Sequence, residues 1–238
     1  MKSFLIKCIQ ACINSYEGKH GKVKKIFDVW QKNVKDNIEY YFGIKNNVLN
    51  IVFRGSDKSE ESQKGLKGWF KRLFAGWKDW AQNLDTHSID VDGGEMHLGI
   101  FEDNMKIQRH CENQIKKYDT INIIGHSKGA MQAGVLSYFM QKLFPKKDIQ
   151  PVLVAPAGFI SKKLLKALDN AIVIMNGEDF ICKIPQWKFV KAWKFKRFIH
   201  IGKQNIGLKI PLIRAIGAKD HYPQKYLESM KKYNKVIL

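Results

Sequence analysis

The sequence predicts an α/β protein with a mostly parallel central sheet and helices on both faces. Short runs of apolar and β-branched residues occur at 120–124, 149–154 and 170–175. Segments with helical apolar spacing alternate with these runs, at roughly 96–118, 128–144 and 161–169. A parallel strand that helices cover on both faces is apolar throughout, as these runs are. Because no internal repeat or Pro/Gly-rich linker divides the chain, we expect one domain over 1–238.

The segments on either side of this pattern predict a first helix, a hairpin and a last strand. Residues 1–15 are apolar and basic, but Lys7 interrupts the apolar run before it reaches the length of a signal peptide, so an amphipathic helix is expected. Residues 37–54 predict two strands joined at 45–47, where two Asn residues tolerate the left-handed backbone of a tight turn. Residues 196–201 have the alternating side-chain pattern of a strand, which is the last strand expected. No apolar stretch of about 20 residues predicts a transmembrane helix.

Composition narrows the class of protein. With 45% hydrophobic residues in 238, the chain can bury a core, which excludes a disordered protein. The 41 basic residues exceed the 22 acidic ones, and the net charge of +19 indicates an anionic partner. Most of these bases are Lys, which lacks the planar fork that reads bases, so the charge argues against sequence-specific recognition of DNA, and nucleic acid is not the preferred partner. The four Cys form no CxxC pair, which favours reduced thiols, as in a cytoplasm, over a disulfide framework or a zinc site.

One short motif predicts a nucleophile. Residues 125–129, GHSKG, fit the pattern G-x-S-x-G, in which glycines allow a sharp turn from strand to helix. The motif directly follows the predicted strand 120–124 and directly precedes the predicted helix 128–144. This context predicts that Ser127 is raised above the sheet as a nucleophile.

A serine nucleophile needs a base and an acid, which follow it in the chain in this kind of fold. Only His200 and His221 come after Ser127. His200 lies in the alternating strand, whereas His221 precedes the last helix, so His221 is the preferred base. Asp179 comes just after the strand 170–175, at the edge where open α/β sheets place their sites, and is the preferred acid. The alternatives for the acid are Glu178 and Asp169.

Seven blocks resemble, in order, the class 3 (fungal-type) lipase family. They are FRGS at 53–56, DWAQNLD at 79–85, HLGIF at 97–101, IIGHSKG at 123–129, APAGF at 155–159, NGEDFICKIP at 176–185 and DHYPQKY at 220–226.

The resemblance implies an α/β-hydrolase fold and ester hydrolysis without a metal or cofactor. It implies Ser127 as nucleophile, Asp179 as acid and His221 as base, with Ser56 and the backbone N–H of Lys128 forming an oxyanion hole. The chain departs from the family pattern at Lys128, where Leu is more usual, at Ala130, where a second Gly is usual, and in a longer gap after Ser56. The substrates of the fungal enzymes are therefore not carried over.

The insertion at 57–78 predicts a lid. Its first part, 57–68, is polar, and an apolar stripe at helical spacing follows, consisting of Leu66, Trp69, Phe70, Leu73, Phe74 and Trp77. Within 66–78, four bases lie off the stripe, as in helices that bind at a membrane interface. Because the segment follows Ser56, we interpret it as a lid over the site; the alternative is a helix that packs on the core. A second basic and aromatic stretch, 187–194, either flanks the same opening or forms a half-buried strand.

These observations predict a serine carboxylic-ester hydrolase that acts on lipid, of lipase or phospholipase A type, and contacts anionic membrane surfaces peripherally. The alternative is a nonenzymatic basic protein that binds an anionic membrane surface or nucleic acid on a hydrolase fold. A fold used only for binding has no need of the three reactive side chains, and all three are present, which favours the enzyme.

Overall fold

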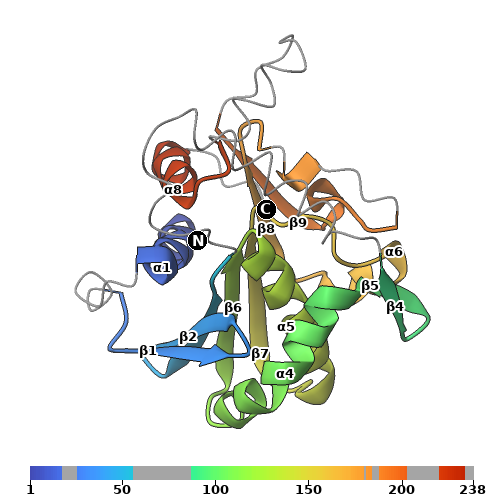
Figure 1. Ribbon diagram of the computed structural model, residues 1–238. Helices are drawn as coiled ribbons and strands as arrows, with labels where there is room; N and C mark the ends of the chain where they lie inside the picture. Colours follow the sequence, from blue (N-terminus) through green and yellow to red (C-terminus); the bar gives the residue numbers. More distant parts are fainter. Residues whose placement is uncertain (18–25, 56–86, 180, 184–187, 203–219, 234–238) are drawn as a thin grey trace.

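A computed structural model describes residues 1–17, 26–55, 87–179, 181–183, 188–202 and 220–233 of the protein. Its main sheet has seven strands in the order β1-β2-β3-β6-β7-β8-β9 (Figure 1). The strands of this sheet are β1 (Val29–Lys35), β2 (Ile38–Lys45), β3 (Val48–Phe53), β6 (Thr120–His126), β7 (Asp148–Val154), β8 (Ile172–Asn176) and β9 (Arg197–Ile201). A separate antiparallel ribbon consists of β4 (Ser88–Val91) and β5 (Gly94–His97). The described α-helices are α1 (Lys2–Glu17), α4 (Leu98–Ile115), α5 (Lys128–Leu143), α6 (Lys162–Leu165) and α8 (Pro223–Lys232).

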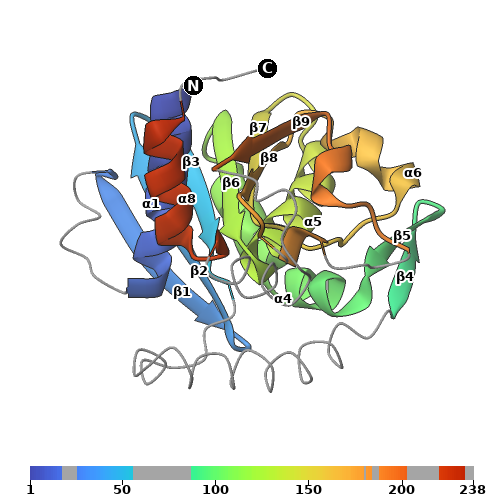
Figure 2. The same cartoon turned by 90° about the horizontal axis from the view of Figure 1, so that it is seen from above.

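The sheet is mostly parallel and is covered on both faces. β1, β2 and β3 pair antiparallel, whereas β3, β6, β7, β8 and β9 pair parallel. Figures 1 and 2 show α1 and α8 side by side on one face and α4 and α5 on the other. The predicted fold class is therefore confirmed. Because parallel strands point the same way, the loops after β6 and β8 meet at one edge of the sheet.

Several elements lie where local sequence predicts them. The three apolar runs are β6, β7 and β8, and the expected helices are α4, α5, and α6 with the short 3-10 helix that follows it. The first 15 residues form most of α1. In the predicted hairpin, Asn46 and Asn47 connect β2 to β3 with φ values of 50° and 60°, the left-handed conformations that such a turn requires.

Other elements differ from the sequence prediction. β1 was not expected, because an edge strand with few buried side chains carries little apolar signal. Residues 96 and 97 belong to β5 rather than to the helix expected from 96, and the turn before β5 contains Asp92 and Gly93, both with positive φ. Asp-Gly is a hairpin signal that identifies this ribbon. The suggested strand at 187–194 is wrong: within the part that the structure describes, residues 192–194 form a 3-10 helix.

The interior contains the four cysteine thiols. Cys8, Cys12, Cys111 and Cys182 are all free and buried. Burial raises the pKa of the Cys12 thiol to about 12, because the thiolate would lose its hydration. Such thiols are poor nucleophiles at neutral pH.

Among the described helices, none combines the length and apolar character that a membrane crossing requires.

Candidate active site

Ser127 lies in a sharp turn between β6 and α5. β6 ends at His126 and α5 begins at Lys128, so a single residue reverses the chain direction. Ser127 has φ 57° and ψ −125°, a backbone conformation that residues other than Gly rarely adopt. Its N–H donates to the carbonyl of Val154 at 3.0 Å, which ties the turn to β7. This is the geometry expected of a nucleophile elbow.

The two glycines of the motif are required by close packing around the turn. A Cβ at position 125 would lie 2.0 Å from the carbonyl oxygen of Gly129. A Cβ at position 129 would lie 2.5 Å from the carbonyl oxygen of Phe53, at the end of β3. Both distances are far below van der Waals contact, so any side chain at either position would displace the turn that holds Ser127.

His221 lies between Ser127 and Asp179. Its Nε2 is 2.9 Å from Ser127 Oγ, and its Nδ1 is 2.9 Å from Asp179 Oδ2 and 3.1 Å from Oδ1. Asp179 follows β8 and His221 precedes α8, so three distant parts of the chain meet at the carboxyl edge of the sheet. Because an ionised carboxylate only accepts, His221 Nδ1 carries the proton and Nε2 presents its lone pair to the Ser127 hydroxyl.

Asp179 is fully buried, with 0% of its surface exposed. The N–H of Ile181 donates to its Oδ1 at 2.9 Å, and the Tyr226 hydroxyl donates to its Oδ2 at 2.6 Å. A buried carboxylate is costly unless it is hydrogen-bonded, and these donors, with His221, supply those bonds. They also fix the direction in which the carboxylate faces the imidazole.

His126 forms a second layer beneath His221. Its Nε2 is 2.8 Å from the backbone carbonyl oxygen of His221, and its Nδ1 is 2.9 Å from the hydroxyl of Tyr16 in α1. Burial lowers the pKa of His126 well below its ordinary value, so the ring is neutral at pH 7.

Sequence reasoning missed three of these residues. His126 stands inside the GHSKG motif and Tyr226 inside the block DHYPQKY, so both could have been identified as neighbours of the site. Tyr16 has no local signal, because it lies far along the chain from every motif.

The side chains considered as alternatives are engaged elsewhere. His200 lies in β9, as expected, and its Nε2 donates to the carbonyl of Gly177 at 2.8 Å. Glu178 pairs with Lys183. Asp169 precedes β8, at the opposite edge of the sheet, and its carboxylate is 3.7 Å from Lys196 Nζ.

The residues expected to form the oxyanion hole and the lid are only partly described. Lys128 begins α5, where backbone N–H groups point out of the helix, and its Nζ pairs with Asp103 of α4 at 2.8 Å. Ser56 lies outside the described residues, as does the whole 57–78 segment, with Leu66, Trp69, Phe70, Leu73, Phe74 and Trp77. Within the described part of the chain, no group of three or more His, Cys, Asp or Glu residues is arranged to hold a metal ion.

Solved structures of fungal lipases have the same fold. A triacylglycerol lipase from Penicillium expansum is 13% identical, with a TM-score of 0.60, and 83% of this chain and 77% of that chain are covered. A triacylglyceride lipase from Rhizomucor miehei is 12% identical, with a TM-score of 0.58 and coverage of 84% and 78%. Lipase II from Rhizopus niveus is 12% identical, with a TM-score of 0.56 and coverage of 82% and 76%. No curated protein sequence matches the chain.

A protein-family model identifies the family of this chain, which sequence identities of 12–13% to solved structures do not establish. The model described as lipase (class 3) matches residues 50–189, which contain most of β3, the sharp turn at Ser127 and the loop with Asp179 after β8. The match covers more than half of the chain, and the predicted resemblance is confirmed. The protein belongs to the class 3 lipase family, whose members are ester hydrolases with an α/β-hydrolase fold.

Proposed function

We propose that the protein is a lipid ester hydrolase that uses Ser127, His221 and Asp179 to form and break an acyl-enzyme. The observation that carries this proposal is the line of hydrogen bonds from Asp179 through His221 to Ser127 Oγ, each about 3 Å long. These distances fall in the range that proton transfer between a nucleophile and its base requires.

The geometry supports a two-step acyl transfer. Ser127 Oγ attacks the ester carbonyl carbon while its proton moves to His221 Nε2, and Asp179 stabilises the resulting imidazolium. His221 then gives this proton to the departing alcohol. Water, deprotonated in turn by His221, attacks the acyl-enzyme, releases the fatty acid and restores the Ser127 hydroxyl. The backbone N–H of Lys128, together with Ser56, would donate hydrogen bonds to the oxyanion. Each donor is worth about 3 kcal/mol of transition-state stabilisation.

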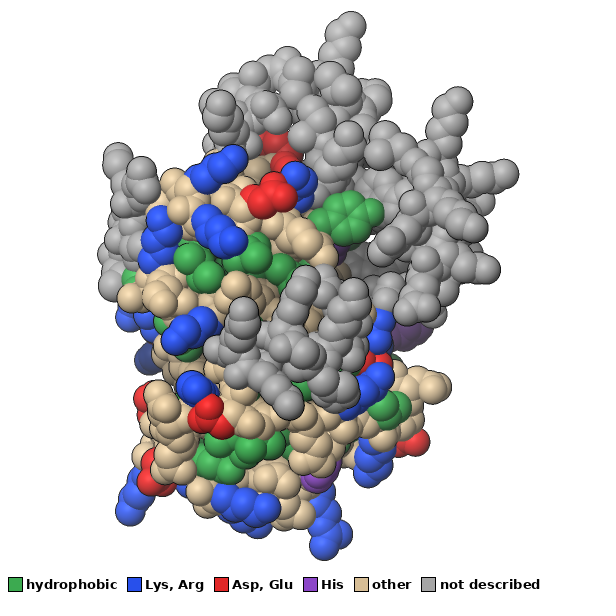
Figure 3. Space-filling view, turned by 90° about the vertical axis from the view of Figure 1, so that its left-hand side faces the viewer, with side chains coloured by type: hydrophobic (Ala, Val, Ile, Leu, Met, Phe, Trp, Pro, Cys, Tyr) green, Lys and Arg blue, Asp and Glu red, His purple; other side chains and the backbone are tan. Residues whose placement is uncertain are grey.

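The proposed substrate is a lipid at an interface rather than a small soluble ester. Within the 57–78 segment, residues 66–78 have an apolar stripe and four bases, the composition of a helix that lies on a membrane, and we propose that the segment covers the site until it meets lipid. A net charge of +19 favours anionic surfaces, which makes phospholipids candidate substrates together with triacylglycerol. Figure 3 shows Lys and Arg side chains spread over one described face, with acidic side chains among them.

The same net charge also favours a second candidate, a nonenzymatic protein that binds an anionic membrane or nucleic acid. The two candidates differ in one measurement. An enzyme reacts with a fluorophosphonate probe at its nucleophile, whereas a binding protein with this fold has no need of a reactive serine.

Labelling and three variants test the proposed function. We expect the probe to label Ser127, and Ser127→Ala to fold normally while its activity on a p-nitrophenyl ester falls at least about a thousandfold. His221→Ala should lose activity with little change in melting temperature. His200→Ala is the matched control: it removes another imidazole near the same edge of the sheet and should lower stability while keeping activity. Labelling of another serine, loss of activity in His200→Ala alone, or no reaction with any ester would overturn the assignment.

A further inference from the structure

We propose that Tyr16 and His126 act as positioning residues, which hold the backbone of His221 so that its imidazole meets Ser127. The inference rests on the proposed roles of Ser127 and His221, and it adds a helix outside the matched region 50–189 to the machinery of the site. Neither residue is expected to touch substrate.

The direction of each hydrogen bond in this chain follows from chemistry. The carbonyl oxygen of His221 only accepts, so His126 Nε2, at 2.8 Å, must carry the proton. A neutral imidazole has one N–H, so Nδ1 is then an acceptor, and the Tyr16 hydroxyl at 2.9 Å donates to it. The order Tyr16 to His126 to His221 is therefore fixed, and it selects one tautomer of His126.

The burial of His126 keeps this arrangement in one state. Only 3% of its surface is exposed, and its ring centroid is 4.8 Å from that of His221. A protonated His126 would place a buried positive charge beside the ring that must itself become an imidazolium during the reaction. Burial and the neighbouring His221 both lower the pKa of His126, so the neutral ring persists while His221 gains and loses its proton.

The backbone at His221 is held at two successive residues. The carbonyl of Asp220 accepts from Asn176 Nδ2 at 3.1 Å, and the carbonyl of His221 accepts from His126. Asn176 ends β8 and His126 ends β6, so the base is fixed to two strands of the sheet. His126 also directly precedes Ser127. One strand end therefore sets the positions of both the nucleophile and the base.

Tyr16 reaches this layer through a space that Gly55 leaves open. A Cβ at position 55 would lie 2.1 Å from the Tyr16 hydroxyl oxygen and 2.6 Å from the carbonyl oxygen of His126. The aromatic ring of Tyr16 packs edge-on against that of His126, with centroids 5.7 Å apart. Figure 2 shows α1 alongside α8, the helix that follows His221. The hydroxyl is thus enclosed between the end of β3 and the turn that holds Ser127.

A positioning role predicts a specific kinetic effect. A misplacement of about 1 Å in a reacting group can cost about a hundredfold in rate. The loss of one hydrogen bond in a chain of two should shift His221 less than that, so we expect Tyr16→Phe to lower kcat about tenfold. KM for a short soluble ester should stay unchanged, because the substrate contacts are intact.

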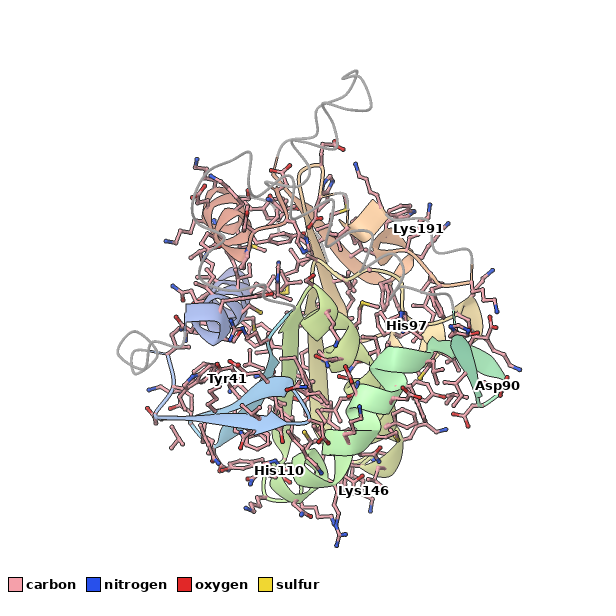
Figure 4. All side chains as sticks on the ribbon, in the orientation of Figure 1. Tyr41, Asp90, His97, His110, Lys146 and Lys191 are labelled. Carbon is pink, nitrogen blue, oxygen red and sulfur yellow. The ribbon has the colours of Figure 1, made fainter. Side chains whose placement is uncertain are left out.

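Tyr16→Phe and Tyr40→Phe form a matched pair for the test. The Tyr40 hydroxyl lies 2.6 Å from His110 Nδ1, so this control also removes a tyrosine hydroxyl that is hydrogen-bonded to a histidine; Tyr40 is fully buried, whereas Tyr16 is partly buried. Figure 4 places His110 on α4 at the end of the molecule away from α8. We expect Tyr40→Phe, at the more deeply buried tyrosine, to lose at least as much melting temperature as Tyr16→Phe, and kcat to fall in Tyr16→Phe alone. The rate of fluorophosphonate inactivation should fall in parallel with kcat, because it reports on the same attack by Ser127.

Two variants of His126 extend the test. Gln retains one donor and one acceptor and should keep more kcat than Leu, which has neither. If the Leu variant fails to fold, Tyr16→Phe and His126→Gln decide the question on their own. A kcat for Tyr16→Phe within about twofold of the Tyr40→Phe value would overturn the positioning role, as would a raised KM with unchanged kcat. Failure of the proposed function is a separate result, in which the unaltered protein does not hydrolyse esters or Ser127→Ala keeps its activity.

Discussion

Asp179 is the residue whose surroundings most constrain the site. It is fully buried and accepts hydrogen bonds from Ile181 N–H, the Tyr226 hydroxyl and His221. Removing one donor from a buried carboxylate leaves part of its charge unsatisfied, which costs more than the loss of an exposed hydrogen bond. The Tyr226 hydroxyl is therefore expected to serve both stability and orientation.

We predict that Tyr226→Phe lowers kcat about tenfold and the free energy of unfolding by about 1.5–3 kcal/mol, the usual range for a hydrogen bond to a charged group. Steady-state kinetics and denaturant unfolding measure the two effects. Tyr138→Phe is the control. Tyr138 lies on α5, away from the site, and its hydroxyl also donates to a carboxylate, that of the half-exposed Asp92. Unchanged kcat in Tyr226→Phe would mean that the remaining donors are enough to orient Asp179.

At the scale of elements, the 57–78 segment is expected to decide which substrates the protein meets. Its apolar stripe supplies the hydrophobic part of membrane binding. Each of the four bases within residues 66–78 adds about 1 kcal/mol near an anionic leaflet, which a neutral bilayer does not supply. The two contributions predict different responses to salt, because only the charge is screened.

Changing Trp69, Phe70 and Phe74 to Ser should reduce activity on vesicles far more than activity on a soluble short-chain ester. Vesicle sedimentation should show tighter binding to phosphatidylglycerol than to phosphatidylcholine, and the difference should shrink as salt is added. A helix that only packs on the core predicts loss of stability and equal loss on both substrates. Equal binding to both vesicles at low salt would contradict the electrostatic contribution.

For the whole molecule, buried histidines predict sensitivity to acid. Burial lowers the pKa of both His97 and His126 from the ordinary value of 6.5. The unfolded chain therefore takes up protons at these rings below about pH 6.5, whereas the folded protein resists them. Their contribution to stability is present above that pH and is lost as the pH falls toward the lowered values. Asp220 acts in the opposite direction, because burial raises its pKa and the folded protein favours its protonated form.

We expect the free energy of unfolding, followed by denaturant titration, to fall between pH 7 and pH 5, since three histidines with a lowered pKa, His97, His110 and His126, outweigh one carboxyl. His126→Gln removes one of these rings and should make the slope shallower. Glu39, whose pKa is lowered, should contribute only at more acidic pH. Constant stability across this range would rule out the buried histidines as the cause, and an unchanged slope in His126→Gln would rule out His126 as a contributor.

The sequence by itself determined the fold class and the positions in the chain of the apolar runs that form the parallel strands β6, β7 and β8. Residues 120–124 and 170–175 are predictable because a strand buried on both faces needs an uninterrupted apolar run. The elbow is predictable because its glycines are a local steric requirement. Asp179 and His221 were selected by their order along the chain and by their places after a strand and before a helix. Their catalytic roles stay a prediction, but the structure brings them together with Ser127.

Only the tertiary structure decided what surrounds these side chains. Tyr16 and His126 are 110 residues apart, and no local pattern indicates that they meet. The same holds for the Tyr226 hydroxyl, which reaches Asp179 across 47 residues. β1 carries so little apolar signal that only its pairing with β2 defines it. Local backbone conformation depends mainly on neighbours in the sequence, whereas burial and hydrogen bonds between distant residues depend on how the elements pack, and packing is a property of the whole chain.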